Sequence, residues 1–183
     1  SNLVSTAVAD LDYARGGGLE FGEMVIFAAR PSHGKSAVAL QCLHEWTSQG
    51  MPCCMVSEEM SSLMIGKRTI QHITALNQEH WATRADYIDS DIEAYRTSHA
   101  PCFILENCRT AEKAANEVER KVKEDGIRCA VVDYAQLLQS PGRSRYEQIT
   151  NTSIALRQLA SRAKIVLLVL CQLNRQIENR PGK

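Results

Sequence analysis

The fold is decided by one stretch, MVIFAARPSHGKS, which runs from Met24 to Ser36. Its first six residues are apolar and predict a buried strand, and the residues after Ser36 predict a helix. A loop between a strand and a helix that contains Gly34-Lys35-Ser36 is typical of phosphate-binding loops, because its backbone N–H groups and the helix N-terminus bind phosphates. In such a loop Lys35 reaches the β- and γ-phosphates and the Ser36 hydroxyl binds Mg²⁺.

The general form of this loop begins with glycine, whereas this chain has Ala29. The alternative is therefore a tight strand–helix turn that contains Gly-Lys-Ser by coincidence. Within the loop, His33 is expected to be a solvent-facing turn residue rather than a catalytic one. The residues that we expect to surround the phosphates are Arg30, Pro31, Ser32, His33, Gly34, Lys35 and Ser36.

Four further apolar runs follow along the chain, and helical patterns lie between the runs. The runs are short, aliphatic and nearly continuous, which is typical of strands buried on both faces of a parallel sheet. The alternation predicts an α/β fold, a mostly parallel sheet of five or more strands flanked by helices, with functional residues just after the strand carboxyl ends. The expected strands are 24–29, 53–57, 102–105, 129–133 and 165–171; the expected helices are 36–49, 61–76, 110–123 and 146–163, with a more polar helix between 77 and 99.

Acidic and amide side chains follow three of these strands. Asp133 ends the fourth strand, where a carboxylate can hold Mg²⁺; its alternative is a turn or capping role. Glu58 and Glu59 follow the second strand, where a carboxylate can polarise the water that attacks a γ-phosphate; their alternative is an exposed first-turn acid favoured by the helix dipole. Chemistry alone does not choose between the two glutamates. Gln172 leaves the last strand, where it either contacts the γ-phosphate or simply ends the strand.

The net charge of zero hides an asymmetry along the chain. Residues 1–139 hold 13 basic and 19 acidic side chains, net −6, whereas residues 140–183 hold 8 basic and 2 acidic ones, net +6. A neutral total gives no sign of nucleic-acid binding, but the basic part removes that objection. Within it, Arg143 and Arg145 lie in a loop beside Tyr146, which suits contact with a single strand; the alternative is a solvated charged loop.

The seven cysteines lie mostly in apolar runs, where thiols behave as small hydrophobic groups. The sequence has no CxxC and no cysteine–histidine cluster with zinc spacing, which argues against a metal site of that kind. The pattern fits a reducing cytosol. The longest strongly apolar stretch, from Ile165 to Cys171, is far shorter than the ~20 residues of a membrane span.

Taken together, these motifs resemble the RecA-like ATPase domain of DnaB-type replicative helicases. In that family the phosphate loop carries Ala-Arg-Pro-Ser, so Ala29 agrees with the family pattern. His33 stands where Met is usual, Ser36 where Thr is usual, and Glu58 where Leu is usual. The resemblance runs from about Asp10 to the last residue. The stretches that carry it are Asp10–Asp12, Gly17–Glu23, Ala29–Ser36, Ser57–Ser61, Asp133–Leu138, Arg145–Glu147 and Gln172–Arg175.

The resemblance implies the motor domain of a DNA helicase that hydrolyses ATP with Mg²⁺. It places the catalytic glutamate at Glu59, assigns Lys35 to the triphosphate, and assigns Ser36 and Asp133 to the metal. Gln172 then becomes the sensor of the γ-phosphate. The candidates for contact with DNA are Arg143, Arg145 and Arg175.

The resemblance also implies partners and an assembly. A homo-hexameric ring would bind ATP between neighbouring subunits and move on single-stranded DNA in the cytoplasm, with a primase and a helicase loader as partners and no membrane. Residues 1–18 are expected to be a lead-in or linker segment and residues 19–183 the RecA-like ATPase domain. The family's arginine finger falls past position 183, so we expect this chain alone to bind ATP and hydrolyse it slowly, because such an arginine is worth about 10³–10⁵ in rate.

Two alternatives stay open. Another RecA-like ATPase, such as a recombinase or a circadian-clock ATPase, shares the same loop and strand-end acids. A non-enzymatic module whose nucleotide gates assembly is a second alternative, although Lys35, Ser36, Glu59 and Asp133 are all present.

Overall fold

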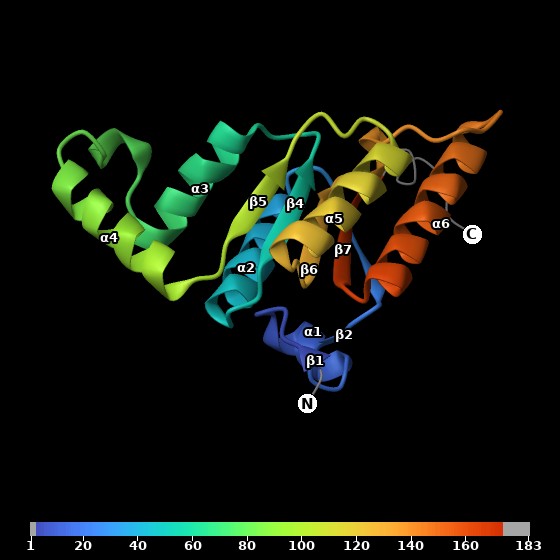
Figure 1. The fold of residues 1–183 in the computed structure, drawn as a ribbon. Coiled ribbons are helices and arrows are strands. Elements are labelled where there is room, and N and C mark those ends of the chain that lie inside the picture. Colours follow the sequence, from blue (N-terminus) through green and yellow to red (C-terminus); the bar gives the residue numbers. More distant parts are fainter. Residues whose placement is uncertain (1–2, 174–183) are drawn as a thin grey trace, which may run out of the picture.

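A five-stranded parallel sheet forms the centre of the computed structural model, which describes residues 3–173 (Figure 1). The strand order is β3-β7-β6-β4-β5, and all four neighbouring pairs run parallel. This confirms the α/β class and the parallel sheet. The strands are β3 (Met24–Ala29), β4 (Cys53–Ser57), β5 (Cys102–Leu105), β6 (Cys129–Asp133) and β7 (Val166–Gln172).

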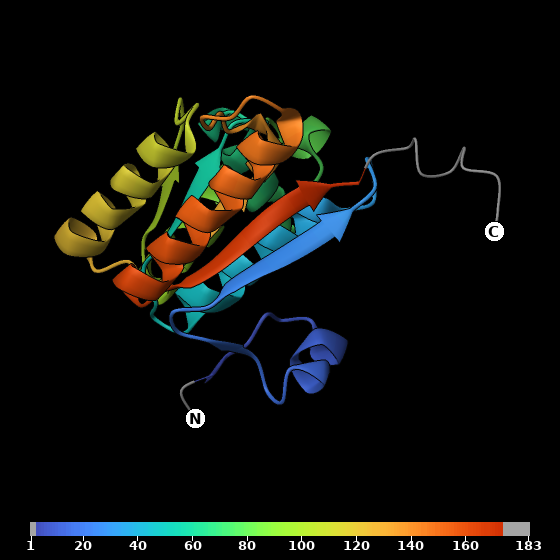
Figure 2. The same ribbon diagram turned by 90° about the vertical axis from the view of Figure 1, so that its right-hand side faces the viewer.

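Helices cover both faces of the sheet, because alternate residues of each central strand point to opposite sides. Cys54 and Val56 of β4 pack with α5 (Ala111–Asp125) and α6 (Arg145–Ala163). Their neighbours Cys53 and Met55 pack with α2 (Lys35–Ser48) on the other face. Figure 2 shows α5 and α6 together on one side of the sheet and α2 on the other. Two apolar layers therefore hold the sheet in place.

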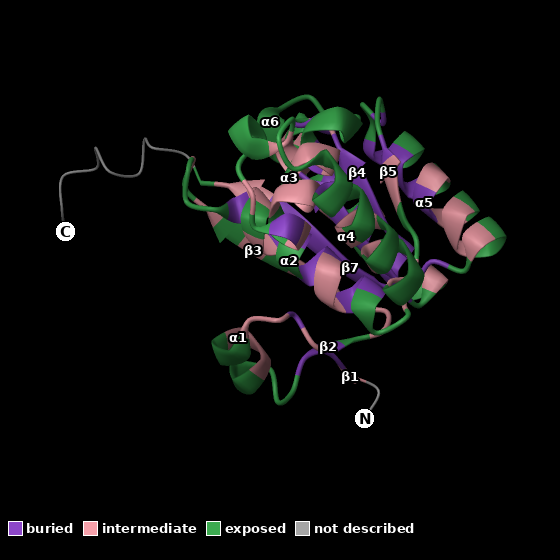
Figure 3. Cartoon of the chain, turned by 90° about the vertical axis from the view of Figure 1, so that its left-hand side faces the viewer, coloured by how far each residue is buried: buried purple, intermediate pink, exposed green. Residues whose placement is uncertain are grey.

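Burial differs between the central and the outer strands. Every residue of β4 and β6 is buried, as expected for strands covered on both faces. Edge strand β3 is more open, and Ile26 is 52% exposed. In β5, Cys102 is exposed and only Leu105 is buried. The expectation of full burial is therefore wrong for β3 and β5, the two edge strands of the described sheet, because fewer elements surround an edge strand. Figure 3 shows the buried residues concentrated on the central strands and on the helix faces toward them.

A helical hairpin extends from the β5 side of the sheet (Figure 1). It consists of α3 (Ser62–Thr74), the 3-10 turn η1 (Gln78–His80) and α4 (Ala85–Ser98). Ser61 caps α3, since its hydroxyl accepts the N–H of Met64 at 3.3 Å. The polar helix expected between residues 77 and 99 is thus a turn followed by α4.

Four aromatic side chains join this hairpin to α2. The His44 ring stacks on His72 with 4.2 Å between centroids, and His44 Nδ1 lies 2.5 Å from the Tyr95 hydroxyl. The Tyr95 ring stacks in turn on His99, at 3.8 Å. Burial, together with the nearby His72 and His99 rings, lowers the pKa of His44 to about 4. Protonation of His44 is therefore unfavourable in the folded chain.

The segment before β3 contains two short strands and a short helix. β1 (Leu3–Val4) pairs antiparallel with β2 (Leu19–Glu20), and α1 (Ala9–Ala14) lies between them in the chain. A side chain of α2 holds it in place, since Trp46 Nε1 donates to the Ser5 carbonyl at 2.7 Å. In Figure 1 the segment lies below the sheet, on the side where β4 and β5 begin.

No helix among residues 3–173 is long and apolar enough to cross a membrane. All seven cysteines are free thiols, and five of them are buried.

Candidate nucleotide-binding site

The loop from Arg30 to Gly34 joins β3 to α2 at the carboxyl end of the sheet. Ser32 and Gly34 both have left-handed backbone angles, with φ of 63° and 75°. Glycine suits the second position because it lacks the Cβ that is strained there, and α2 begins at the next residue. The His33 ring folds back, its Nδ1 2.9 Å from the Pro31 carbonyl. The side chain is exposed, as the sequence predicted.

Lys35 and Ser36 open α2 and point at acids from two neighbouring strands. Lys35 Nζ lies 3.1 Å from Glu59 Oε2 and 3.1 Å from Asp133 Oδ1. It also lies 3.8 Å from the centroid of the Tyr134 ring. The Ser36 hydroxyl donates to Asp133 Oδ2 at 2.8 Å. The structure thus brings together the four side chains that the sequence singled out on separate elements.

The sheet register explains why these acids meet. β4 and β6 are paired neighbours, with Ser57 opposite Asp133, so the residues that follow each strand lie side by side. The Glu58 N–H donates to the Asp133 carbonyl at 3.0 Å and extends this pairing by one bond. Asp133 is fully buried beneath the loop, whereas the Glu59 side chain is 44% exposed. Lys35 therefore contacts one buried carboxylate, Asp133, and one partly exposed carboxylate, Glu59.

The donor set fits a magnesium ion shared with a phosphate ligand. A hydroxyl and a carboxylate are hard oxygen donors, and Mg²⁺ typically takes only one or two carboxylates, with phosphates and water completing its shell. No group of three or more His, Cys, Asp or Glu side chains within residues 3–173 could hold a metal alone. Asp133 Oδ1 is buried and has no hydrogen bond of acceptable geometry in the described part of the chain. That oxygen is balanced electrostatically by Lys35 instead.

The two adjacent glutamates point in different directions. Glu58 Oε1 accepts the backbone N–H of Cys108 at 2.5 Å, which ties the loop after β4 to the loop after β5. Burial and the nearby Glu58 carboxylate raise the pKa of the Cys108 thiol. Glu59 faces Lys35. Chemistry alone did not choose between these two glutamates, but their contacts differ: Glu59 faces the lysine of the site and Glu58 does not.

A cavity of about 410 Å³ lies over this cluster. Gln172 lines it from the end of β7. His33 and the buried Asp133 are not among the lining side chains. The residues that line it are Arg30, Pro31, Ser32, Gly34, Lys35, Ser36, Ala37, Glu59, Arg68 and Gln172.

The arginines proposed for DNA lie apart from this cavity. Arg143 and Arg145 are exposed where α6 begins, after the 3-10 turn η2 (Ala135–Leu137). The Arg145 guanidinium donates to the Gln136 carbonyl, and the Arg143 N–H donates to Glu147 Oε2 at 2.6 Å. Arg175 lies outside the described residues.

Three residues of the site were missed by sequence reasoning. Arg68 lines the cavity from α3, and no motif marks it. Tyr134 packs its ring against Lys35, and its place directly after Asp133 was the available signal. Gln136 binds the backbone of Gln172 through its side-chain amide. Contacts of this kind depend on the packing of distant elements, which no local pattern encodes.

A parallel sheet with a glycine-containing loop after β3, a lysine and serine opening the next helix, and a buried acid at the end of β6 defines a RecA-like P-loop nucleotide-binding fold. The family model described as the DnaB-like helicase C terminal domain matches residues 4–183. This chain belongs to that family, as the motifs predicted.

Individual relatives agree with the family model. A probable plasmid replicative DNA helicase of Chlamydia trachomatis is 32% identical over 188 residues, which cover 97% of this chain and 41% of that protein. The replicative DNA helicase DnaB of Pasteurella multocida is 28% identical, over 98% of this chain and 41% of that protein. The chain therefore spans about two fifths of the length of these curated relatives.

Solved structures show the same fold. A DnaB-like replicative helicase, described with its interactions with primase, superposes with a TM-score of 0.83 at 27% identity, over 100% of this chain and 46% of that one. A second solved structure, described as an ATPase domain, gives a TM-score of 0.82 at 27% identity, over 97% of this chain and 66% of that one.

Proposed function

We propose that this chain is the motor domain of a replicative DNA helicase, which hydrolyses ATP and couples hydrolysis to movement on single-stranded DNA and to unwinding of the duplex. The observation that carries this proposal is the cluster in which Lys35 contacts Glu59 and Asp133 while Ser36 binds Asp133, at the mouth of a cavity. Membership of the helicase family supplies the reaction class.

Each residue of the cluster has a part in binding the nucleotide. The loop from Arg30 to Ser36, with the N-terminus of α2 behind it, provides N–H groups and a positive dipole for the triphosphate. When ATP binds, Lys35 Nζ moves from its two carboxylate partners to the β- and γ-phosphates, which are negatively charged as the carboxylates are. Ser36 and Asp133 would hold Mg²⁺, which would supply positive charge against the charge that develops on the phosphates.

Glu59 is our candidate for activating the attacking water. Its carboxylate lines the cavity and is open to solvent on one side, as a group that must accept a water proton requires. Gln172 lines the same cavity, where its amide can contact the γ-phosphate. ATP and water then yield ADP and phosphate, with Glu59 taking the proton from the water as the bond to phosphorus forms.

DNA contact is assigned to Arg143, Arg145 and Arg175. The first two are exposed in a part of the chain that carries a net charge of +6 between residues 140 and 183. A ring of six subunits would repeat this modest patch around a channel and give a basic pore from a neutral chain. The primase described with one structural neighbour supports a primase partner here. We extend the proposal to a helicase loader and to the cytoplasm, which the free thiols suit.

The relatives favour a helicase over the other RecA-like ATPases. The curated proteins named above are replicative DNA helicases, and none is a recombinase or a clock protein. A non-enzymatic nucleotide-gated module is disfavoured by the site, because its lysine, hydroxyl and two acids are in mutual contact.

The test is ATP hydrolysis by the purified chain, with and without single-stranded DNA. We expect Glu59→Gln to lower the rate by about 10²–10⁴-fold while nucleotide binding is retained. The adjacent Glu58→Gln is the matched control and should leave the rate within a few-fold of wild type, since that side chain faces Cys108. Equal rates for wild type and Glu59→Gln would remove Glu59 from the chemistry.

A further inference from the structure

One side chain, Gln136, joins the cavity to the loop proposed to contact DNA. Its amide clamps the backbone of Gln172: the Gln172 N–H donates to Gln136 Oε1 at 3.2 Å, and Gln136 Nε2 donates to the Gln172 carbonyl at 2.9 Å. Both polar groups of the Gln172 backbone thus depend on a residue 36 positions earlier in the chain. A displacement of Gln172 must move Gln136 or break two hydrogen bonds.

Gln136 is bound on its other side to the start of α6. Its backbone carbonyl accepts from the Arg145 guanidinium, and Arg145 is the first residue of that helix. The same guanidinium reaches Gln148 Oε1 at 3.5 Å, one turn further along. Gln136 therefore contacts the end of β7 through its side chain and the N-terminus of α6 through its backbone.

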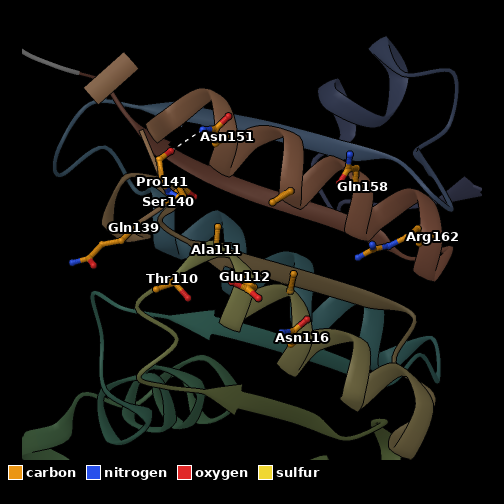
Figure 4. A pocket seen from close by; sticks show the side chains of 12 residues that line it. Thr110, Ala111, Glu112, Asn116, Gln139, Ser140, Pro141, Asn151, Gln158 and Arg162 are labelled. Atoms are coloured by element: carbon orange, nitrogen blue, oxygen red, sulfur yellow. Dashed lines mark hydrogen bonds between the residues drawn. The ribbon is translucent and has the colours of Figure 1, made fainter. Parts of the chain in front are cut away.

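The loop before α6 is fastened to that helix. The Ser140 and Thr152 hydroxyls lie 2.8 Å apart, and Thr152 is buried. Asn151 Nδ2 donates to the Pro141 carbonyl at 2.7 Å, the bond drawn in Figure 4. At position 142 an added Cβ would come within 2.8 Å of the backbone nitrogen of Gln148, so the glycine permits the close approach. Residues 140–145 and the first turns of α6 thus form one unit.

We propose that Gln136 is a positioning residue that couples the nucleotide site to this loop. The proposal rests on the proposed function, in which Gln172 contacts the γ-phosphate and Arg143 and Arg145 contact DNA. When Gln172 engages the phosphate, its backbone shift passes through the paired amide bonds to Gln136. The Gln136 carbonyl then shifts Arg145, and with it the loop. Gln136 touches neither ligand and acts through its neighbours.

The experiment measures amide hydrogen exchange of the chain with and without Mg²⁺ and ATPγS, a slowly hydrolysed ATP analogue. The readout is the peptide that covers residues 141–148, and nucleotide binding is measured on the same samples. In wild type we expect nucleotide to change exchange in this peptide on the order of 5-fold or more, the size of a typical coupling between sites. Gln136→Ala should bind nucleotide within a few-fold of wild type but lose the response of the loop.

Two further variants sharpen the test. Gln139→Ala is the matched control, because it removes a glutamine side chain only three residues away in the same segment. The hydrogen bonds of Gln139 to Arg109 and Ala111, beside the start of α5, use its backbone and not its side chain. Gln139→Ala should keep the full response. Gln136→Glu keeps an acceptor for the Gln172 N–H but loses the amide that donates to the Gln172 carbonyl. It should therefore weaken the response of the loop, and it serves as the test if Gln136→Ala does not fold.

The outcomes separate the two proposals. Failure of wild type to bind nucleotide would refute the proposed function. Nucleotide binding without a loop response in wild type would overturn the role of Gln136, as would a response in the folded Gln136 variants equal to that of Gln139→Ala.

Discussion

Replacing Lys35 by Met is expected to destabilise the fold, because Lys35 is the counter-charge of a buried carboxylate. The Asp133 side chain is 0% exposed and its Oδ1 lies 3.1 Å from Lys35 Nζ. Removing one partner of a buried ion pair costs about 3–5 kcal/mol, since the other charge stays buried and unpaired. The contact with Glu59 adds only about 0–1 kcal/mol, because that side chain is 44% exposed and water screens the pair.

The assay is a double-mutant cycle in urea with wild type, Lys35→Met, Asp133→Asn and the double variant. With a urea slope of about 1–3 kcal/mol per M, the loss in Lys35→Met lowers the unfolding midpoint by about 1–5 M. In the double variant the uncompensated charge is gone, so it should be more stable than the sum of the single losses predicts, by about 2 kcal/mol or more.

A matched control is available on α5. Lys121 pairs with Asp125 at 2.8 Å and also lies over an aromatic ring, but its partner carboxylate is 29% exposed. Lys121→Met should therefore cost much less than Lys35→Met. Single losses at Lys35 and Asp133 that add within about 0.5 kcal/mol would refute the reasoning, because independent sites behave in that way.

Three more predictions follow from the structure. Glu58→Ala leaves the buried N–H of Cys108 without its acceptor and should lower the free energy of unfolding in urea by about 1–3 kcal/mol, and Glu58→Gln should lower it less. Equal stability of wild type, Glu58→Ala and Glu58→Gln would show that the contact is unimportant. The pKa of His44 is lowered to about 4 in the folded chain, so the unfolded chain binds more protons between pH 6.5 and 4. The contribution of His44 to stability should therefore be complete above pH 6.5 and be lost as the pH falls from 6.5 to 4. In urea unfolding the loss should be less steep for His44→Gln than for wild type. Arg68→Ala should weaken nucleotide binding on the order of 10-fold at unchanged melting temperature, because Arg68 lines the cavity as a cation; unchanged affinity would place its guanidinium away from the phosphates.

The fold was largely predictable because its signals are local. Four of the five expected strands have the predicted bounds, and the fifth is displaced by one residue to Val166–Gln172. Lys164, in a left-handed conformation, ends α6 and sets where β7 begins. The folded segment before β3 was less visible. Its stability depends on side chains of α2, such as Trp46, whose bond to the Ser5 carbonyl joins residues 41 positions apart.

The candidate site divides in the same way. Lys35, Ser36 and Asp133 sit at strand and helix ends, so their meeting follows from the order of the strands. The choice of Glu59 over Glu58 required the family resemblance, because adjacent residues in a loop point in directions that only the packing decides. Gln136 lies in the stretch Asp133–Leu138 that carries the family resemblance, but its role was not predicted, since it depends on a side chain reaching across the end of the sheet to Gln172. The roles of the arginines toward DNA stay predictions.

Equilibrium nucleotide binding tests the central claim most directly. A fluorescent ATP analogue is titrated with wild type and with folded Lys35→Met, each with and without Mg²⁺. We predict saturable binding by wild type that Mg²⁺ tightens, and no saturable binding by Lys35→Met. Binding by Lys35→Met equal to that of wild type, or wild-type binding indifferent to Mg²⁺, would contradict a nucleotide site built on Lys35, Ser36 and Asp133.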